Sequence, residues 1–260
     1  MTAVEQVRSG GLGIYDLHGR NAVVVGGSSG IGAATAVRLA EVGATVAVGY
    51  RSGRERAEKV VESLPGEGHF TVPIDILDTA VLTAAAEQLA SVFGRVDVLI
   101  NSGGTTVRIP HDDLDALDDT TFDQILAANV RGPFATVRAL RSLLEASGDG
   151  VVVNVSSISG FTGSGSNVAY CASKAGLDSL SRSLGRALGP TIRFVSIAPA
   201  AVDTDFVPGR DREAVAAQAA STPLKVLADP DDVAVSILGV VTHLRLTTGS
   251  LVVTDGGKWL

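Results

Sequence analysis

Two side chains that could exchange a proton with a substrate lie four residues apart in the chain. They are Tyr170 and Lys174, in the segment Tyr-Cys-Ala-Ser-Lys. In a helix this spacing places both side chains on one face. A nearby ammonium group favours the phenolate form and lowers the pKa of a tyrosine from about 10 toward the working range of a general acid/base. The spacing therefore predicts a proton-transfer pair, the alternative being a pair on a solvated helix surface.

Other polar residues favour the first interpretation. Ser156 and Ser157 follow the β-branched run Val151–Val155, and Ser157 lies thirteen residues before Tyr170. If that run is a strand of a parallel sheet, both serines lie at its carboxyl edge, where ligands bind in such sheets. Asn129 lies inside a long apolar segment of helical period, where an amide needs a hydrogen-bond partner. We therefore expect these side chains to belong to one polar site.

A glycine-rich loop follows the first apolar run of the chain. The run Ala22–Val25 leads into Gly-Gly-Ser-Ser-Gly-Ile-Gly, residues 26–32, and then into a segment of helical period. Glycines at such a turn let backbone N–H groups approach a pyrophosphate at the N-terminus of the helix. The loop predicts dinucleotide binding, the alternative being a turn that only joins a strand to a helix.

The end of the second apolar run bears on which dinucleotide binds. An acidic residue there would hydrogen-bond the ribose hydroxyls of NAD, but the run ends in Val-Gly-Tyr-Arg-Ser without a carboxylate. The guanidinium group of Arg51 and the hydroxyl of Ser52 can instead bind a 2′-phosphate through charge-assisted hydrogen bonds. We expect NADP(H) as the preferred cofactor, with NAD(H) as the alternative if Arg51 only begins a solvated helix.

Apolar runs and amphipathic segments alternate along the chain. This alternation predicts a parallel sheet with helices on both faces, a doubly wound α/β fold of the Rossmann type with seven parallel strands. The predicted strands are Ala22–Gly26, Thr45–Gly49, Phe70–Ile74, Val96–Ile100, Val151–Val155, Ile192–Ile197 and Leu251–Thr254. The predicted helices are Ile31–Val42, Arg54–Leu64, Thr79–Phe93, Phe122–Leu144, Ala169–Leu188 and Asp231–Leu244.

No linker or shift in composition divides the chain. We expect a single domain over residues 16–260, preceded by a mobile extension at residues 1–15. The segment 199–230 interrupts the alternation and carries a short Ala-rich helical signal at Arg212–Ala220. Because long connections in compact domains are often binding loops, we expect a substrate lid here, the alternative being a surface excursion.

Together these residues resemble the short-chain dehydrogenases/reductases of the classical type, from about Leu17 to Gly257. The loop is similar to the family's Thr-Gly-x-x-x-Gly-x-Gly, with Val25 in place of the threonine. The resemblance implies a catalytic tetrad, in which Tyr170 exchanges the proton and Ser157 binds the same substrate oxygen, or Ser156 if the register differs by one. Lys174 would lower the pKa of the tyrosine and hold the ribose hydroxyls on the nicotinamide side. Asn129 would fix a water molecule in a proton relay.

Other segments match the family with changes. Asn101-Ser102-Gly103-Gly104 resembles its Asn-Asn-Ala-Gly, and Pro199-Ala200 stands where the family has Pro-Gly. By the same resemblance Asp75 would contact the adenine amine, and Val202 and Thr204 would meet the nicotinamide carboxamide. The expected cofactor-binding residues, besides Tyr170 and Lys174, are Gly26, Ser28, Ser29, Gly30, Ile31, Gly32, Arg51, Ser52, Asp75, Ile76, Asn101, Gly103, Pro199, Val202 and Thr204.

Composition and charge argue against several classes of function. The chain is 45% hydrophobic and carries a net charge of −7, so it can bury a large core while its surface repels nucleic acid and anionic membranes. Its four histidines lie far apart and indicate no metal site, and its one cysteine cannot form an intrachain disulfide. Residues 1–13 lack the apolar region of a secretory signal, and no apolar run is long enough to span a membrane. We expect a cytoplasmic protein.

The expected activity is hydride transfer between the nicotinamide and a small ketone or secondary alcohol. The resemblance extends to 3-oxoacyl carrier-protein reductases, which we keep as the alternative because Ser147–Gly150 and Gly189–Thr191 lack the basic residues that grip an acidic carrier there. A dinucleotide-binding regulator without turnover is the alternative of another class, although binding alone needs no acid/base residues. The family resemblance also implies a homotetramer, or a dimer, built on the last strand and the helix before it.

Overall fold

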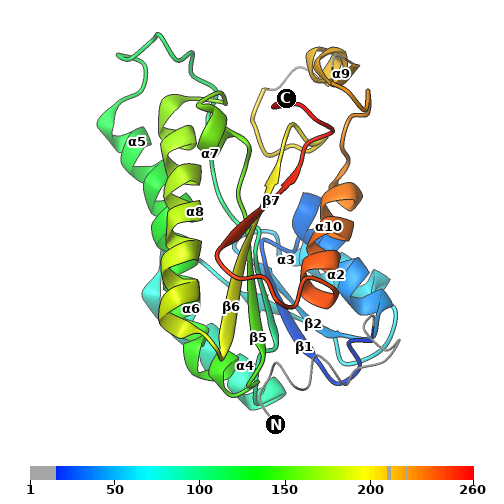
Figure 1. Cartoon of the computed structure of the whole chain (residues 1–260). Helices are drawn as coiled ribbons and strands as arrows, with labels where there is room; N and C mark the ends of the chain where they lie inside the picture. Colours follow the sequence, from blue (N-terminus) through cyan, green and yellow to red (C-terminus); the bar gives the residue numbers. More distant parts are fainter. Residues whose placement is uncertain (1–15, 210–211, 221) are drawn as a thin grey trace.

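The computed structural model describes residues 16–209, 212–220 and 222–260, and their centre is a seven-stranded sheet between two helical layers (Figure 1). The strand order is β3-β2-β1-β4-β5-β6-β7, and every neighbouring pair is parallel. The predicted doubly wound fold is confirmed. The expected extension at 1–15 and residues 210, 211 and 221 of the expected lid lie outside the described residues. The strands are β1 (Asn21–Val25), β2 (Thr45–Tyr50), β3 (Phe70–Pro73), β4 (Val98–Asn101), β5 (Gly150–Val155), β6 (Ile192–Pro199) and β7 (Ser250–Thr254).

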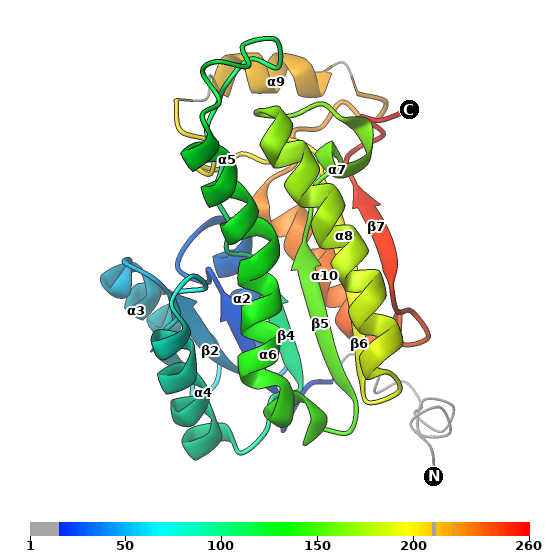
Figure 2. The same ribbon diagram turned by 90° about the vertical axis from the view of Figure 1, so that its left-hand side faces the viewer.

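Helices cover both faces of the sheet (Figures 1 and 2). They are α2 (Gly30–Glu41), α3 (Arg54–Ser63), α4 (Thr79–Phe93), α5 (Asp119–Leu126), α6 (Gly132–Glu145), α7 (Ser159–Thr162), α8 (Val168–Leu188), α9 (Arg212–Ala220) and α10 (Pro230–Thr242). Leu39 of α2 and Ile237 of α10 belong to the buried cluster on one face, whereas Leu89 of α4 and Leu144 of α6 belong to the cluster on the other. Strands buried on both faces explain the continuous Val/Ile runs of the sequence. Within the described residues, no helix combines the length and apolarity that crossing a bilayer requires.

One predicted helix is wrong as a continuous element. The segment Phe122–Leu144 divides into α5, a π-helical stretch at Ala127–Arg131 and α6. Pro133 lies in the first turn of α6 and has no N–H, so it cannot donate the usual helical hydrogen bond to the carbonyl of Asn129 four residues earlier. The proline therefore accounts for the irregular backbone at a residue expected to be functional, as is common for π-helical turns.

The carboxyl ends of the central strands meet at one edge of the sheet. Backbone hydrogen bonds join this edge across the chain: Gly27 N–H donates to Gly49 O at 2.9 Å, Ser102 N–H to Val25 O at 3.1 Å, and Ser156 N–H to Ile197 O at 2.7 Å. These bonds bring the glycine loop, the segment after β4 and the serines after β5 to a common edge, as expected for ligand sites in parallel sheets.

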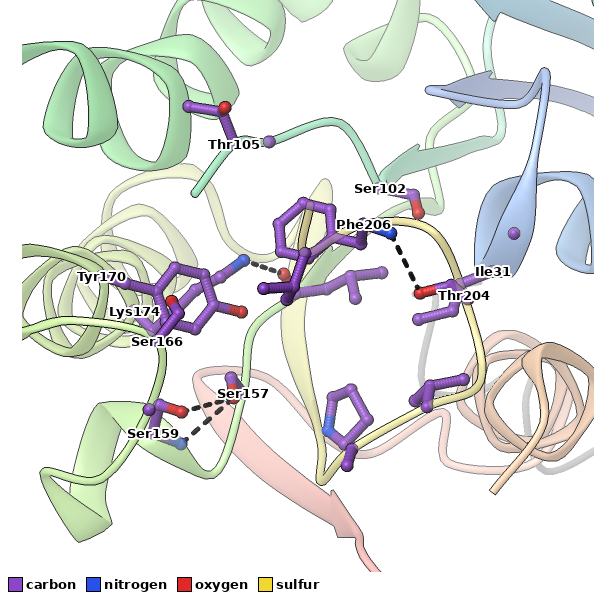
Figure 3. A pocket seen from close by; sticks show the side chains of 18 of the residues that line it. Ile31, Ser102, Thr105, Ser157, Ser159, Ser166, Tyr170, Lys174, Thr204 and Phe206 are labelled. Carbon is purple, nitrogen blue, oxygen red and sulfur yellow. Dashed lines mark hydrogen bonds between the residues drawn. The ribbon is translucent and has the colours of Figure 1, made fainter. Parts of the chain in front are cut away.

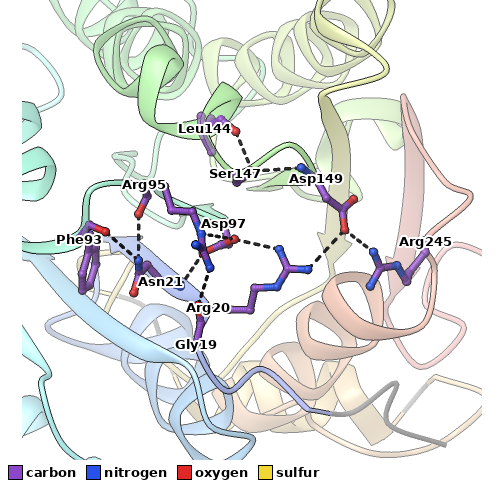
Figure 4. Close-up of polar contacts among 10 residues, drawn as sticks. All are labelled: Gly19, Arg20, Asn21, Phe93, Arg95, Asp97, Leu144, Ser147, Asp149 and Arg245. Atoms are coloured by element: carbon purple, nitrogen blue, oxygen red, sulfur yellow. Dashed lines mark hydrogen bonds and ion pairs between the residues drawn. The ribbon is translucent and has the colours of Figure 1, made fainter. Parts of the chain in front are cut away.

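A cluster of ion pairs lies at the opposite end of the strands (Figure 4). Asp97 is 2% exposed at its side chain and accepts hydrogen bonds from Arg20 Nη1 and the N–H of Asn21, both at 2.9 Å. Arg95 Nε lies 3.2 Å from both carboxylate oxygens of Asp97. Asp149, just before β5, pairs with Arg245 and lies 3.8 Å from Arg20. The cluster joins the starts of β1, β4 and β5 far from the carboxyl edge.

We expect Asp97→Asn to lower the free energy of unfolding by about 2 kcal/mol, because hydrogen bonds from charged donors to a buried acceptor are each worth about 1.5–3 kcal/mol and the amide keeps only part of them. Urea denaturation would measure the change. The exposed pair Arg141–Glu145 provides the control, and Glu145→Gln should change the free energy of unfolding by less than about 0.5 kcal/mol. Equal effects of the two variants would contradict a special role for Asp97.

Candidate active site

A cavity of about 1570 Å³ opens at the carboxyl edge of the sheet. Single small ligands typically occupy cavities of about 300–1,000 Å³, so the space suffices for a dinucleotide and a second molecule. The predicted site residues that line it are Gly26, Ser28, Ser29, Gly30, Ile31, Arg51, Ser52, Ile76, Gly103, Ser157, Tyr170, Lys174, Pro199, Val202 and Thr204. Gly32, Asp75, Asn101 and Asn129 are not among the lining residues.

The glycines of the loop are required by close contacts. Gly26 has φ +74° and Gly30 has φ +53°, a region that residues with a side chain rarely adopt. A Cβ atom on Gly26 would lie 2.9 Å from the backbone nitrogen of Gly103, and one on Gly32 would lie 2.2 Å from the carbonyl oxygen of Gly26. At the N-cap of α2, Ser29 makes no side-chain capping hydrogen bond. The loop thus presents backbone, without side-chain bulk, at the start of a helix, which fits a pyrophosphate.

Lys174 and Tyr170 lie on α8 beside the cavity (Figure 3). Lys174 is 5% exposed, its Nζ donates a hydrogen bond to Val155 O at 2.7 Å, and Nζ lies 5.6 Å from the centroid of the Tyr170 ring. Burial lowers the pKa of Lys174 to about 8, and the nearby Asp178 opposes this change. Asn167 caps the helix by accepting a hydrogen bond from Tyr170 N–H at 2.7 Å. The arrangement brings the ammonium group and the tyrosine ring together at the wall of the cavity, as expected of a proton-transfer pair.

The two serines after β5 have different hydrogen bonds. Ser156 Oγ donates to the backbone carbonyl of Lys174 at 3.4 Å. Ser157 Oγ donates to Ser159 Oγ at 3.1 Å and accepts from the Ser159 N–H at 3.1 Å (Figure 3). A Cβ atom on Gly165 would lie 2.7 Å from Ser159 Oγ, so Ser159 is held closely from the other side. The hydroxyl of Ser157 can exchange its bond to Ser159 for one to a ligand oxygen.

Asn129 and Asn101 support the site from behind the wall of the cavity. Asn129 is 1% exposed; its Oδ1 accepts from Thr105 N–H, and its Nδ2 donates to Thr105 O and to Ser173 Oγ, at 2.9, 2.9 and 3.0 Å. It therefore joins the segment after β4 to α8. Asn101 Nδ2 donates to Asn154 Oδ1 at 2.8 Å across β4 and β5. Asp75 Oδ1 accepts from the N–H of Leu77 in the turn after β3.

Sequence reasoning missed several lining residues. Arg56 lies in the first turns of α3, and Trp259 lies near the C-terminus, where its ring centroid is 5.5 Å from that of Phe161. Asp255 shapes the terminal turn by accepting from the N–H groups of Gly257 and Trp259. The one signal for Arg56 was its place in a run of three arginines, Arg51, Arg54 and Arg56, which does not single it out. The one signal for Trp259 was that it is the single tryptophan of the chain.

Replacement of Gly32 by alanine should weaken NADPH binding by about 100-fold or more, because the new Cβ would displace the loop and cost several charge-assisted hydrogen bonds of about 1.5–3 kcal/mol each. Fluorescence titration of NADPH would measure the affinity. A Cβ atom added to Gly239 on α10 would meet no described atom of another segment within 4 Å, so Gly239→Ala is the matched control and should bind normally. An unchanged affinity in Gly32→Ala would show that the loop does not hold the dinucleotide.

Comparison with known proteins agrees with this geometry. The family model described as short chain dehydrogenase matches residues 20–214. The chain is 37% identical over 241 residues to a protein described as ketoacyl reductase 2 of the granaticin polyketide synthase of Streptomyces violaceoruber, covering 92% of this chain and 96% of that protein. It is 34% identical over 242 residues to the cis-4-hydroxycyclohexanecarboxylate dehydrogenase of Sinomonas cyclohexanicum, with the same coverage of both chains.

A solved structure has the same fold. The 7α-hydroxysteroid dehydrogenase complexed with NADH and 7-oxo glycochenodeoxycholic acid superposes with a TM-score of 0.87 at 27% identity, covering 95% of this chain and 97% of that one. The match of the family model over most of the chain, together with relatives above 30% identity, establishes the assignment. The chain belongs to the short-chain dehydrogenase/reductase family, and it is an oxidoreductase that acts on CH–OH or C=O groups with NAD(P).

Proposed function

We propose that the protein transfers hydride between NADP(H) and a small ketone or secondary alcohol, with Tyr170 as the general acid/base. The observation that carries the proposal is that Tyr170, Lys174 and Ser157 line the same cavity as the glycine loop. A dinucleotide bound along that loop and a carbonyl group beside Tyr170 would therefore share one space. The cofactor, when bound, supplies or accepts the hydride.

The residues of the chain would then handle the substrate oxygen. In reduction, Tyr170 gives its phenolic proton to the oxygen, and in oxidation it takes the proton back. Ser157 donates a hydrogen bond to the same oxygen in place of its bond to Ser159. The ammonium of Lys174 stabilises the phenolate and donates to the ribose hydroxyls of the cofactor. Asn129 holds α8 against the segment after β4 through Ser173 and Thr105, and its part in a proton relay stays a proposal.

The preference for NADP(H) is supported by two arginines. Arg51 and Arg56 both line the cavity, and among the described residues neither forms an ion pair. Arg54, between them in sequence, instead pairs with Glu58 through Nε at 2.8 Å and is not a lining residue. Arg51 directly follows β2, and Arg56 lies in the first turns of α3. Two guanidinium groups that have no carboxylate partner in the described part of the chain suit a dianionic 2′-phosphate.

The adenine side and the nicotinamide side complete the proposed cofactor site. Ile74, Ile76 and Leu77 line the cavity after β3, and Asp75 lies in the same turn, where we propose that it contacts the adenine. At the other end Pro199, Val202 and Thr204 line the cavity after β6 and would contact the carboxamide. Asn101 would act indirectly, by holding the end of β4 against Asn154.

The substrate part of the cavity has an apolar cover. Phe206 lies with its ring centroid 6.1 Å from that of Tyr170, and Val207, Ile109 and Trp259 also line the cavity. This wall suits a compact ketone or alcohol with an apolar body. A carrier-linked 3-oxoacyl substrate is the second candidate, because a protein described as a ketoacyl reductase is 37% identical to this chain.

We propose that the assembly is a homotetramer, or a dimer, formed through β7. This strand is the last in the sheet, with only β6 beside it among the described strands, and Val253 within it is 37% exposed. An edge strand with exposed apolar side chains is a common place for subunits to associate. Light scattering at several protein concentrations would give the mass of the assembly.

The wild-type protein should oxidise NADPH in the presence of a ketone, and Tyr170→Phe should lower kcat by a factor of about 100 to 10,000, the usual contribution of a general acid. Absorbance at 340 nm with a panel of free ketones and an acetoacetyl thioester would measure the rates. Faster turnover of carrier-linked than of free ketones would favour the second candidate. NADPH-dependent turnover that survives in Tyr170→Phe would rule out the proposed acid.

Neutral replacement of Arg51 or Arg56 should raise the Kd of NADPH by about tenfold or more and leave the Kd of NADH unchanged, because each removes a charge-assisted hydrogen bond to the 2′-phosphate worth at least about 1.5 kcal/mol. Titration of Arg51→Gln and Arg56→Gln with both cofactors would test this. Arg54→Gln on the same helix is the control and should bind both cofactors as the wild type does. Parallel losses of NADH and NADPH affinity would contradict the assignment.

A further inference from the structure

Asp178 is a buried carboxyl group to which the mechanism above gives no role. It lies on α8 one helical turn after Lys174 and is 6% exposed. Its Oδ1 atom is buried without a hydrogen-bond partner among the described atoms. Placing a carboxyl group inside a protein is costly unless something in its surroundings compensates, so its surroundings indicate what it does.

The pKa of Asp178 is raised, because the effect of burial exceeds that of the surrounding groups that favour its charged form. Burial raises the pKa of the carboxyl, whereas the hydroxyls of Ser156, which directly follows β5, and of Ser196 on β6 lower it. The charged groups that act on it within the described residues, Lys174 and Arg182, both belong to α8 and also lower the pKa. Two hydroxyl groups and two cations near one carboxyl group favour its anionic form, although Ser156 Oγ donates its own hydrogen bond to the carbonyl of Lys174.

A buried hydrogen-bond network holds the groups around Asp178 in position. Ser196 Oγ lies 2.9 Å from Ser181 Oγ, and Asn154 Nδ2 donates to Ser181 Oγ at 2.8 Å. Asn154 in turn accepts from Asn101 at the end of β4. The network therefore fixes the spacing between α8 and the sheet at the level of Asp178, where one helical turn separates it from Lys174.

Few other groups near Lys174 stabilise its charged form. Its ammonium group is buried, and the hydrogen bond that it donates goes to the neutral carbonyl of Val155. Among the described residues, Asp178 is the one charged group that acts on it, and its effect opposes that of burial. A cationic lysine is the form that lowers the pKa of Tyr170.

We propose that Asp178 is a positioning residue that keeps Lys174 cationic beside Tyr170. The inference rests on the proposed function, since it matters for the reaction only if Tyr170 moves the proton. It adds an internal counter-ion to the proton-transfer pair. Tyr170 and Lys174 would then act with a third ionisable group, the carboxyl of Asp178, which does not contact the substrate.

The direction of the pH effect follows from electrostatics. A nearby negative charge makes every proton of the Lys174–Tyr170 pair harder to remove, so its loss lowers the pH at which the pair gives up its first proton. Reduction needs both groups protonated. The basic side of the pH profile of kcat/KM should therefore move to lower pH when the charge is removed.

Asp178→Asn keeps the size of the side chain and removes the charge. We expect the basic side of the kcat/KM profile for ketone reduction to move down by about one pH unit, as an opposite charge at close range typically shifts a pKa by one unit or more. Asp178→Glu should restore most of the shift. Ser181→Ala removes a hydroxyl from the same network without a charge and should leave the position of the basic side unchanged.

NADPH titration against pH is the readout that needs no turnover. Because a cationic Lys174 is the better donor to the ribose hydroxyls, the loss of NADPH affinity with rising pH should also begin about one unit lower in Asp178→Asn. If the amide variant does not fold by circular dichroism, Asp178→Ser is smaller, is also neutral and carries the same expectation.

One result would overturn the role of Asp178. In it, the kcat/KM profile and the NADPH-affinity profile of the neutral variants would differ from those of the wild type only in height, and both would fall at the same pH as in the wild type. This result is distinct from failure of the proposed function. That failure would appear as turnover that survives in Tyr170→Phe when Asp178 is unchanged. An equal shift in Ser181→Ala would also overturn the proposal, since the effect would then come from the network and not from the charge.

Discussion

The buried ammonium group of Lys174 is the constraint around which the site is organised. A cation that is 5% exposed must find its compensation inside the protein, and here the compensation comes from a strand end and from its own helix. Val155 supplies a carbonyl oxygen at 2.7 Å, and Ser157, two residues later, lines the cavity. The same contact that satisfies the lysine therefore sets the distance between α8 and β5, and with it the relation of Tyr170 to the serine.

A second constraint is steric and lies on the cofactor side. Gly26 and Gly32 leave no room for a side chain, because the end of β1, the start of α2 and the segment after β4 approach at backbone contact. This closeness brings Gly103 beside the loop and places both at the wall of one cavity. Beside the substrate part of the site, Pro133 has no N–H to donate to the carbonyl of Asn129, and the helix is irregular there. The side-chain amide of Asn129 then joins Thr105 to Ser173. Tight packing on one side and a local irregularity on the other together shape the site.

Stability and chemistry are separated along the strands. The ion pairs of Asp97 and Asp149 join the strand starts at the edge away from the cavity. The polar groups at the carboxyl edge are those for which we propose binding and proton transfer. Some of them are energetically costly, such as the oxygens of Asn101 and Asp178 that have no partner among the described atoms. Incomplete hydrogen bonding is found at both ends of the strands, because Arg245 Nε in the ion-pair cluster is also buried without a partner among the described atoms.

The sequence by itself determined the strands, most helices, the glycine loop and the spacing of Tyr170 and Lys174, because these depend on periodicity and on neighbours a few residues away. Thr79–Phe93 and Arg212–Ala220 were predicted with the boundaries that the structure has. Only the tertiary structure decided that Arg56 joins Arg51, that Trp259 reaches the cavity, and that Ser156 and Ser196 surround Asp178. The break at Asn129 had a local cause in Pro133, yet which partners its amide would find was again a matter of packing. Contacts between distant segments depend on how helices settle on the sheet, and no local pattern of residues records that arrangement.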